Sequence, residues 1–312
     1  MKIFITGGTG NIGQYVVLDA IAKGHQAVVL SRTPEKHSAL SEMKGVSLVK
    51  GTITDYDILR DCVKSCDAVI HIALGWGDEP VTMLQADTTA TVHLLEMSER
   101  AGIKKFIYTS STAAMGRMRD NMDETVMNLP LDLYGSTKSA SEAYVLGFSN
   151  YYGETLVSGN AVGMKRNIIR PGYTFSNPPY PGGSSQSDRR FRDITNAVVT
   201  NQPIQVIARD GTQFLSAEQI AKLYTALLES DLNEEIFLVL GKEYTTWERV
   251  AQIALEEYPS SKSIIDLYDA GWGEPMLYNI EKMNRIFGLE FSGEDEIRKH
   301  VKWNLEMSLS GK

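Results

Sequence analysis

The sequence has little of what several protein classes require. Its only cysteines are Cys62 and Cys66, and no further Cys or His cluster could complete a zinc site, so we expect two reduced packing residues and no metal. No apolar run reaches the roughly 18 residues that a membrane span needs. The start, MKIFITGGTG, has too short an apolar stretch for a secretory signal. These absences predict a cytoplasmic protein without a membrane partner.

Basic residues are fewer than acidic residues. Lys and Arg number 31 against 39 Asp and Glu, a formal net charge of −8, so no global basic field exists to attract nucleic acid. With 43% hydrophobic and 22% charged residues, the composition is that of an ordinary globular protein. The expected partner is therefore a small molecule.

Short apolar runs alternate with amphipathic stretches in the first half of the chain. The runs are β-branched and continuous, as in strands that are buried on both faces. Strands are predicted at 2–6, 27–31, 46–50, 68–73, 105–110 and 167–170, and helices at 11–24, 55–65, 80–102 and 134–152. This alternation indicates an α/β fold with a doubly wound parallel sheet.

The pattern changes after Arg170. Residues 171–192 are rich in proline and glycine and predict a long irregular loop. Short strands at 204–208 and 235–240 follow, with helices at 217–229, 246–257, 279–287 and 293–309. We expect a dinucleotide-binding domain at 1–170 and a smaller mixed α/β substrate region at 171–312, and exchange of short segments between them is left open.

A glycine-rich segment joins the first predicted strand to the first predicted helix. Glycine lets the backbone turn sharply and approach a pyrophosphate, and the amides at a helix start favour an anion. This position between strand and helix is the context that a dinucleotide site requires. The predicted cofactor contacts in this segment are Gly7, Thr9, Gly10, Asn11, Ile12 and Gly13.

The end of the second predicted strand bears on the choice of cofactor. An NAD site usually has Asp or Glu there to bind the ribose 2′-hydroxyl, whereas an Arg accommodates a 2′-phosphate. The sequence has Ser31 and Arg32. NADP is therefore the expected cofactor, with NAD as the alternative.

Further motifs make the chain resemble the extended short-chain dehydrogenase/reductases, also called the NAD-dependent epimerase/dehydratase family. The resemblance runs through essentially the whole chain. It is carried by TGGTGNIG at 6–13, Ile70-His71-Ile72-Ala73, the hydroxyl-rich stretch at 108–116, Tyr134-Gly135-Ser136-Thr137-Lys138, and Arg170-Pro171-Gly172.

The resemblance implies a Rossmann-type fold and a set of site residues. Tyr134 would be the general acid/base, Lys138 its electrostatic helper and ribose ligand, and Ser111 the hydroxyl that binds the substrate oxygen, with Ser110 and Thr112 as alternatives to Ser111. A nearby ammonium and the nicotinamide charge would favour the Tyr134 phenolate. Further implied cofactor contacts are Thr52, Ile53, Ala73, Thr109 and Pro171. The resemblance also implies a homodimer through a four-helix bundle built from helices at 81–101 and 134–150.

The YxxxK motif occurs three times, so its position decides which copy is functional. Tyr258 to Lys262 contains a proline, and Tyr278 to Lys282 lies far beyond the cofactor half. Only Tyr134 to Lys138 starts a predicted helix shortly after a hydroxyl-rich strand end. The i, i+4 spacing puts both side chains on one helix face. His71 is expected to pack or to bond a backbone group.

Several departures from the family concern the substrate. Thr112-Ala113 stands where family dehydratases carry Asp-Glu, and Tyr173 where nucleotide-sugar epimerases carry Asn. The segment 211–216 lacks the Arg-Asp-aromatic signature that grips a diphosphate. The candidate substrate contacts are Trp76, Ser111, Tyr173, Arg189 and Arg192.

These observations predict an NAD(P)-dependent oxidoreductase or epimerase that acts on a hydroxyl or carbonyl group of a small sugar-like substrate. A nucleotide-sugar epimerase with altered diphosphate anchors is one alternative. An NADP-sensing regulatory protein on the same fold is another.

Overall fold

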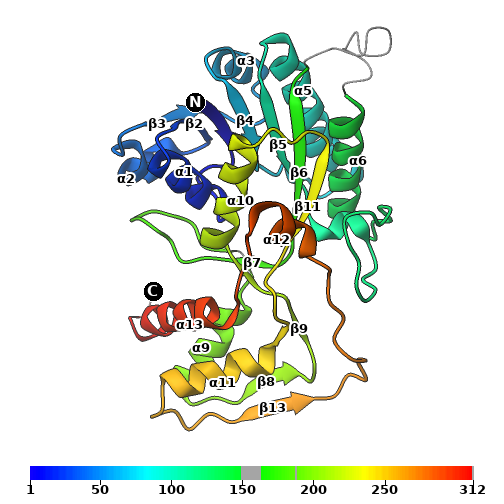
Figure 1. Ribbon diagram of the computed structural model, residues 1–312. Helices are drawn as coiled ribbons and strands as arrows, with labels where there is room; N and C mark the ends of the chain where they lie inside the picture. The colour runs from blue at the N-terminus through cyan, green and yellow to red at the C-terminus, as the bar shows by residue number, and fades with distance from the viewer. Residues whose placement is uncertain (149–162, 187, 311–312) are drawn as a thin grey trace.

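The computed structural model describes residues 1–148, 163–186 and 188–310. Seven parallel strands form its central sheet in the order β11-β6-β5-β4-β1-β2-β3 (Figure 1). They are β1 (Lys2–Thr6), β2 (Gln26–Ser31), β3 (Val46–Lys50), β4 (Ala68–His71), β5 (Lys105–Thr109), β6 (Lys165–Pro171) and β11 (Glu235–Val239). The strand order reverses between β1 and β4, and a reversal of this kind opens a ligand crevice at the carboxyl ends of the strands. The predicted Rossmann-type fold is confirmed.

Helices cover both faces of the sheet. On one face, α1 (Gly13–Ala22) packs against α10 (Ala217–Glu229), with α2 (Ser38–Ser41) and α12 (Glu281–Phe287) beside them. On the other, α3 (Tyr56–Lys64) and α6 (Leu133–Gly147) flank α5 (Ala90–Arg100). The inner strands β6, β5, β4, β1 and β2 are buried on both faces, which explains their largely apolar sequences, whereas the edge strand β3 is partly exposed.

A smaller unit lies below the carboxyl ends of the strands in Figure 1. It contains α9 (Arg190–Thr200), β8 (Ile204–Ile207), α11 (Trp247–Glu257), β13 (Ile265–Tyr268) and α13 (Glu294–Leu309) around one apolar core. Four two-residue strands form two short pairs near this core. Strand β7 (Thr174–Phe175) pairs with β10 (Leu215–Ser216), and β9 (Gly211–Thr212) pairs with β12 (Thr245–Thr246).

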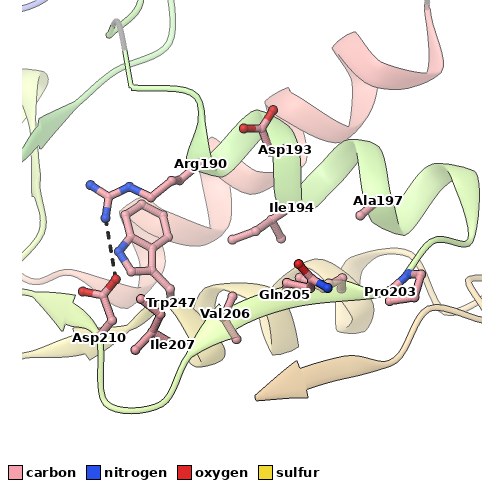
Figure 2. Close-up of a pocket in the computed structure, with 11 residues that line it drawn as sticks. Arg190, Asp193, Ile194, Ala197, Pro203, Gln205, Val206, Ile207, Asp210 and Trp247 are labelled. Carbon is pink, nitrogen blue, oxygen red and sulfur yellow. Dashed lines mark ion pairs between the residues drawn. The ribbon is translucent and has the colours of Figure 1, made fainter. Parts of the chain in front are cut away.

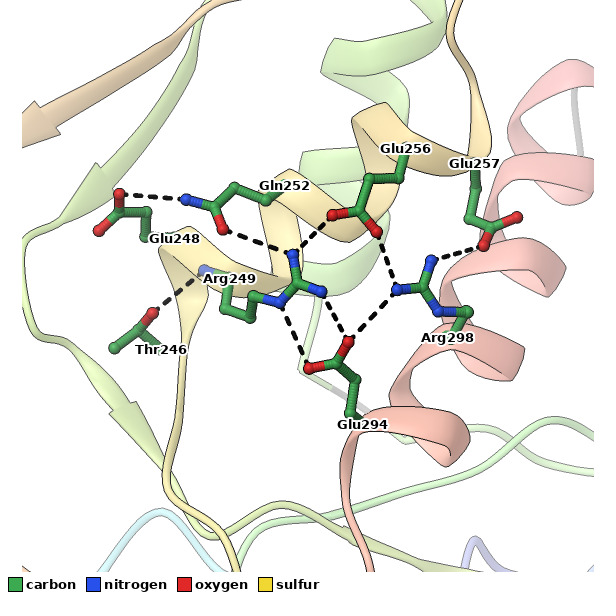
Figure 3. Close-up of polar contacts among 8 residues, drawn as sticks. All are labelled: Thr246, Glu248, Arg249, Gln252, Glu256, Glu257, Glu294 and Arg298. Atoms are coloured by element: carbon green, nitrogen blue, oxygen red, sulfur yellow. Dashed lines mark hydrogen bonds and ion pairs between the residues drawn. The ribbon is translucent and has the colours of Figure 1, made fainter.

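Two arginines tie α11 to α13 in the network of Figure 3. Arg249 reaches across to Glu294 at 2.6 Å and along its own helix to Glu256 at 2.7 Å. Arg298 reaches back from α13 to Glu256 at 2.8 Å and to Glu257 at 2.7 Å. Because each guanidinium holds carboxylates with a planar set of donors, the network orients the two helices more than isolated pairs would.

Some local details differ from the predictions. The predicted helix 80–102 is helical from Pro80 to Arg100, but a π-helical turn (Leu84–Thr89) separates α4 (Pro80–Met83) from α5, and apolar spacing does not reveal such a turn. The predicted loop 171–192 contains β7, and its last residues open α9. Strand β13 was missed because it is short and mostly exposed. The last residues of the predicted helix 134–152 lie outside the described ranges.

The division of the chain into domains at 1–170 and 171–312 stays a proposal. Some elements of the second half pack with the first half. Strand β11 pairs with β6, while α10 and α12 pack on the face that α1 covers. These three elements from the second half therefore lie with the first. Within the described ranges, no helix combines the length and apolar character that crossing a membrane requires.

Candidate functional site

The loop between β1 and α1 leaves no room for a side chain at Gly7 or at Gly13. Gly7 has φ +71°, and a Cβ there would lie 2.6 Å from the Ala73 amide nitrogen. A Cβ at Gly13 would overlap the Gly7 carbonyl. The loop therefore lies directly against the segment that follows β4. No side chain caps the first amides of α1. The residues present therefore fit a pyrophosphate, which needs close backbone approach at a helix start.

A cleft of about 320 Å³ opens beside this loop. Nine of the predicted residues line it: Gly7, Thr9, Gly10, Ser31, Arg32, Thr52, Ile53, Ala73 and Trp76. Leu30, Gly51, Thr54, Leu74, Gly75 and Ala86 complete the lining. The cleft thus joins the ends of β1, β2, β3 and β4, where the strand order reverses.

Three other predicted loop residues do not line the cleft. Asn11 donates to the Thr174 carbonyl at 3.1 Å and accepts from the Ser176 hydroxyl, so it anchors the segment after β6. Ile12 packs against the core under α1. Gly13 contributes only the close contact with Gly7.

The end of β2 presents Arg32 to solvent at the edge of this cleft. Ser31 is buried, and its hydroxyl accepts from the Thr33 amide at 3.3 Å. The Arg32 side chain is exposed, and the ion pairs of the described residues do not include it. A guanidinium without a carboxylate partner can pair with a phosphate.

The hydroxyl-rich end of β5 meets the start of α6. Asp132 caps α6 by accepting from the Gly135 amide at 2.6 Å. This start places Tyr134 near the Ser111 hydroxyl, which acts to lower the Tyr134 pKa. Lys138, one turn later, is 2% exposed, and its Nζ lies 5.9 Å from the Tyr134 ring centre. The three predicted catalytic side chains are therefore brought together.

Two further predicted cofactor residues lie at neighbouring strand ends. Thr109 is buried, and its hydroxyl lies 2.7 Å from that of Tyr224 on α10. Pro171 is the last residue of β6. Both lie at the carboxyl edge of the sheet, although neither is in the lining of the 320 Å³ cleft.

The chain's own groups shift the pKa of Tyr134 and of Lys138. Burial raises the Tyr134 pKa; the nearby Ser111 hydroxyl opposes this, whereas Asp87 and Asp132 add to it. Burial lowers the Lys138 pKa, and Asp87 opposes that shift. In the chain alone, burial is thus the largest influence on Tyr134, and the shift toward phenolate with a nicotinamide bound stays a prediction.

His71 takes no position from which it could serve as a base. Its Nδ1 lies 2.6 Å from the Thr6 hydroxyl and its Nε2 lies 2.9 Å from that of Thr91. Burial, with a smaller effect of Lys138, lowers its pKa to about 3. A neutral imidazole thus joins β1, β4 and α5, as the packing interpretation expected, except that its partners are side chains rather than backbone.

The predicted substrate residues are dispersed. Trp76 is 65% exposed and donates to Asp78 at 3.3 Å. Tyr173 packs among aromatic rings, with centroids 5.1 Å from Phe214 and 5.7 Å from Trp247. Arg189 and Arg192 are exposed at the start of α9.

Arg190, rather than Arg189 or Arg192, lines a cavity, although its side chain is 47% exposed (Figure 2). The cavity measures about 420 Å³ and lies between α9, β8 and the start of α11. The guanidinium stacks 4.2 Å from the Trp247 ring centre. It also pairs with Asp188 at 2.6 Å and with Asp210 at 3.9 Å.

Two residues of this region escaped the sequence analysis. The Tyr278 phenol lies near the Thr112 hydroxyl, which acts to lower the Tyr278 pKa, and Thr112 is next to Ser111. The YxxxK motif that contains Tyr278 was set aside because of its distance along the chain, which the fold removes. Asp87, fully buried beside Lys138, belongs to no motif that would have singled it out.

Curated relatives match parts of the chain. The photosystem II assembly factor Ycf39 of Synechocystis sp. is 34% identical over 110 residues, which are 35% of this chain and 33% of that protein. The decarboxylating sterol-4-alpha-carboxylate 3-dehydrogenase of Dictyostelium discoideum is 30% identical over 156 residues, 46% of this chain and 47% of that protein. The chain thus matches between about a third and a half of the length of these relatives.

Solved structures match nearly the whole chain in shape. UDP-glucuronic acid 4-epimerase from Bacillus cereus, in complex with UDP-glucuronic acid and NAD, has a TM-score of 0.79 at 17% identity and covers 100% of both chains. WbmG from Bordetella bronchiseptica, in complex with NAD and UDP, has a TM-score of 0.78 at 17% identity, with 98% of this chain and 94% of that chain covered. At these identities the likeness shows a shared fold.

The sequence profile of the NAD dependent epimerase/dehydratase family matches residues 3–239, which span the central sheet from β1 to β11. The resemblance predicted from the sequence is thereby confirmed. Membership of this family supports an oxidoreductase or epimerase. The chain belongs to the NAD dependent epimerase/dehydratase family.

Proposed function

We propose that this protein is an NADP-linked oxidoreductase or epimerase acting on a hydroxyl or carbonyl group of a small sugar-like substrate. The observation that carries the proposal is the placement of Tyr134 near Ser111 and beside buried Lys138, at the sheet edge next to the glycine loop. A binding protein would not need an acid/base phenol in this position.

The catalytic steps of the chain's own residues follow from this geometry. Ser111 donates to the substrate oxygen and holds it near Tyr134. In reduction the phenol of Tyr134 donates a proton to that oxygen, and in oxidation the phenolate accepts it. A bound nicotinamide supplies the hydride exchange. Burial is the main cause of the raised Tyr134 pKa, so the chain alone favours the protonated phenol.

Residues on both sides of the cleft would hold the cofactor. The glycine loop would take the pyrophosphate and Lys138 a ribose. At the other end, Ser31 and Arg32 favour NADP, because no carboxylate ends β2 and the guanidinium is exposed at the cleft. The relatives solved with NAD support the dinucleotide, and the preference for the phosphorylated form is our proposal.

The substrate we propose lacks a nucleotide diphosphate. Segment 211–216 contributes no arginine, and its Phe214 is buried among aromatic rings. Arg190 is already paired with two carboxylates. A free sugar, a sugar acid or a similar polar carbonyl compound suits these contacts better than a diphosphate does.

A nucleotide-sugar epimerase is the second candidate. It is supported by the likeness in shape to UDP-glucuronic acid 4-epimerase over the whole chain and by the 420 Å³ cavity beside Trp247. The two candidates differ in the substrate that the cofactor-loaded protein should bind.

The decisive experiment is a panel of sugars, sugar acids and polar carbonyl compounds, offered with NADP or NADPH and followed by nicotinamide absorbance. Turnover that disappears in a Tyr134→Phe variant supports the proposal. Binding of the cofactor without turnover of any compound, including nucleotide sugars, would favour an NADP-sensing regulator instead.

We also propose a cytoplasmic homodimer. Exposed apolar side chains on α4, the π-helical turn and α6 suit the four-helix interface: Val81, Leu84, Leu133 and Tyr144. The cytoplasmic location is proposed because Cys62 and Cys66 are free thiols.

A further inference from the structure

A buried carboxylate faces the lysine of the proposed catalytic group. Asp87 is 0% exposed, and its Oδ2 lies 3.5 Å from Lys138 Nζ. Its Oδ1 accepts from the Gly75 amide at 3.2 Å. Among the described residues, Oδ2 has no hydrogen-bond donor at shorter range. Lys138 is therefore the main partner of this oxygen.

The local fold brings Asp87 to this position. It lies in the π-helical turn Leu84–Thr89, and such turns insert a residue into a helix and are frequent at functional sites. A Cβ at Gly75 would overlap the Ala86 carbonyl, so glycine allows the segment after β4 to touch this turn. The Thr91 hydroxyl donates to the Asp87 carbonyl at 2.9 Å and ties the turn to α5.

Burial of both ions makes their pairing necessary. An isolated charge in the protein interior is costly, and removing one member of a buried pair leaves the other uncompensated. We propose that Asp87 is a positioning residue, whose carboxylate holds the Lys138 ammonium beside Tyr134 and sets the charge that Tyr134 experiences. This inference rests on the proposed catalytic role of Tyr134 and Lys138.

The other groups around the pair do not replace Asp87. Lys138 faces the ring of Tyr108 from β5 at 5.2 Å, His71 from β4, and Tyr134 and Glu142 from α6 itself. Glu142 is engaged by Arg170, whose Nε and Nη2 donate to its two carboxylate oxygens at 2.8 and 2.7 Å.

Tyr134 also faces several groups. These are Ser111, Asp87, Asp132, Tyr108 and Tyr224. Asp132 is already bonded to the Gly135 amide as the cap of α6. Asp87 is thus the charge shared by Tyr134 and Lys138.

The sign of its effect follows from electrostatics. A nearby negative charge raises the pKa of a phenol and of an ammonium alike. Asp87→Asn removes that charge with little change in shape, so both pKa values should fall. The whole profile of kcat/KM against pH should then move to lower pH, by about one unit or more.

The pH profile is measured on the parent and on Asp87→Asn, with Thr88→Val as the matched control. Thr88 lies in the same turn, and its hydroxyl donates to the Thr137 carbonyl at 3.3 Å, so its loss perturbs the turn without changing charge. We expect the profile to move only for Asp87→Asn. A slower Asp87→Asn enzyme with an unmoved profile would overturn the proposal, because a purely structural role predicts that result.

A second measurement needs no turnover. Urea midpoints of Asp87→Asn, Lys138→Met and the double variant form a double-mutant cycle. Pairing predicts that the double variant is more stable than the sum of the single losses allows, and that it folds even if a single variant does not. Additive losses, or a double variant that does not fold, would contradict the pair. Coupling without any turnover would instead leave the pair standing and count against the proposed enzyme.

Discussion

The Tyr278 phenol lies near the Thr112 hydroxyl, which opposes the rise that burial causes in the Tyr278 pKa, although the two residues lie in opposite halves of the chain. Gln213 holds the Tyr278 backbone on both sides: its Oε1 accepts from the Tyr278 amide at 2.7 Å and its Nε2 donates to the Tyr278 carbonyl at 3.3 Å. A bridge between Met122 and Tyr278 adds a third segment. The phenol is therefore fixed at the end of β5, beside Ser111.

From this position we predict that Tyr278→Phe raises the KM of the substrate several-fold with little change in kcat. Loss of one hydroxyl near the bound substrate, away from the proton transfer, weakens ground and transition states alike. Tyr258→Phe is the matched control, because Tyr258 closes α11 in the smaller unit. Steady-state kinetics on both variants makes the comparison. A parental KM for Tyr278→Phe would remove Tyr278 from the substrate site.

Tyr134→Phe should abolish turnover while cofactor affinity stays nearly parental. The change removes only the phenolic oxygen, and the ring keeps its packing.

Lys138→Met should reduce both turnover and cofactor binding, since the ammonium is proposed to assist Tyr134 and to bind the cofactor ribose. Nicotinamide absorbance and fluorescence titration measure the two properties. A Tyr134→Phe protein with a near-parental rate would assign the proton transfer to another group.

Arg32→Ala should weaken NADPH binding by about 1 to 3 kcal/mol and leave NADH binding nearly unchanged, since a charge-assisted hydrogen bond to the 2′-phosphate is lost. Arg60→Ala is a suitable control, because Arg60 is an exposed arginine of α3 paired with Asp57. Calorimetry with both cofactors measures the difference. Equal losses for the two cofactors, or tighter binding of NADH to the parent, would contradict the preference for NADP.

Cofactor-loaded protein should not bind UDP, dTDP or GDP sugars with micromolar affinity in calorimetric titrations. Binding of any one would favour the assignment as a nucleotide-sugar epimerase.

Arg190→Ala should raise the KM of the substrate that the protein turns over, because Arg190 lines the cavity beside Trp247. Arg189→Ala, the exposed neighbour, should leave KM unchanged. If both variants behave alike, the cavity has no part in substrate binding.

The protein should lose stability as the pH falls from about 6.5 toward 5. Burial lowers the pKa of His71 and of His300 to about 3, so each is neutral in the folded state and takes up a proton on unfolding. Each buried histidine should contribute a loss of about 1.4 kcal/mol per pH unit once the pH is below the unfolded value. Above that value each histidine is neutral in both the folded and the unfolded state, so no stability is lost. Urea midpoints between pH 8 and pH 5 measure the slope, and a flat response would show that neither histidine is buried neutral.

Much of the fold could be predicted from local sequence patterns. Strands β1, β2, β4 and β5 could be predicted because a strand buried on both faces is a continuous apolar run whose signal needs no distant partner. Helix α10 was predicted with its observed bounds because its apolar period is regular. The π-helical turn at 84–89 and strand β13 could not be, since tertiary contacts rather than apolar spacing decide them.

The sequence by itself determined the glycine loop, the pairing of Tyr134 with Lys138 on one face of α6, and the absence of a carboxylate at the end of β2. Each of these depends on residues within a few positions of one another. Only the tertiary structure decided that Asp87 faces Lys138, that Tyr278 lies near Thr112, and that Arg190 rather than Arg189 or Arg192 lines a cavity. Those relations depend on where a helix starts and on which distant segments the sheet edge brings together. Burial, which set the direction of the Tyr134 pKa, is a property of that packing and is not encoded in any single motif.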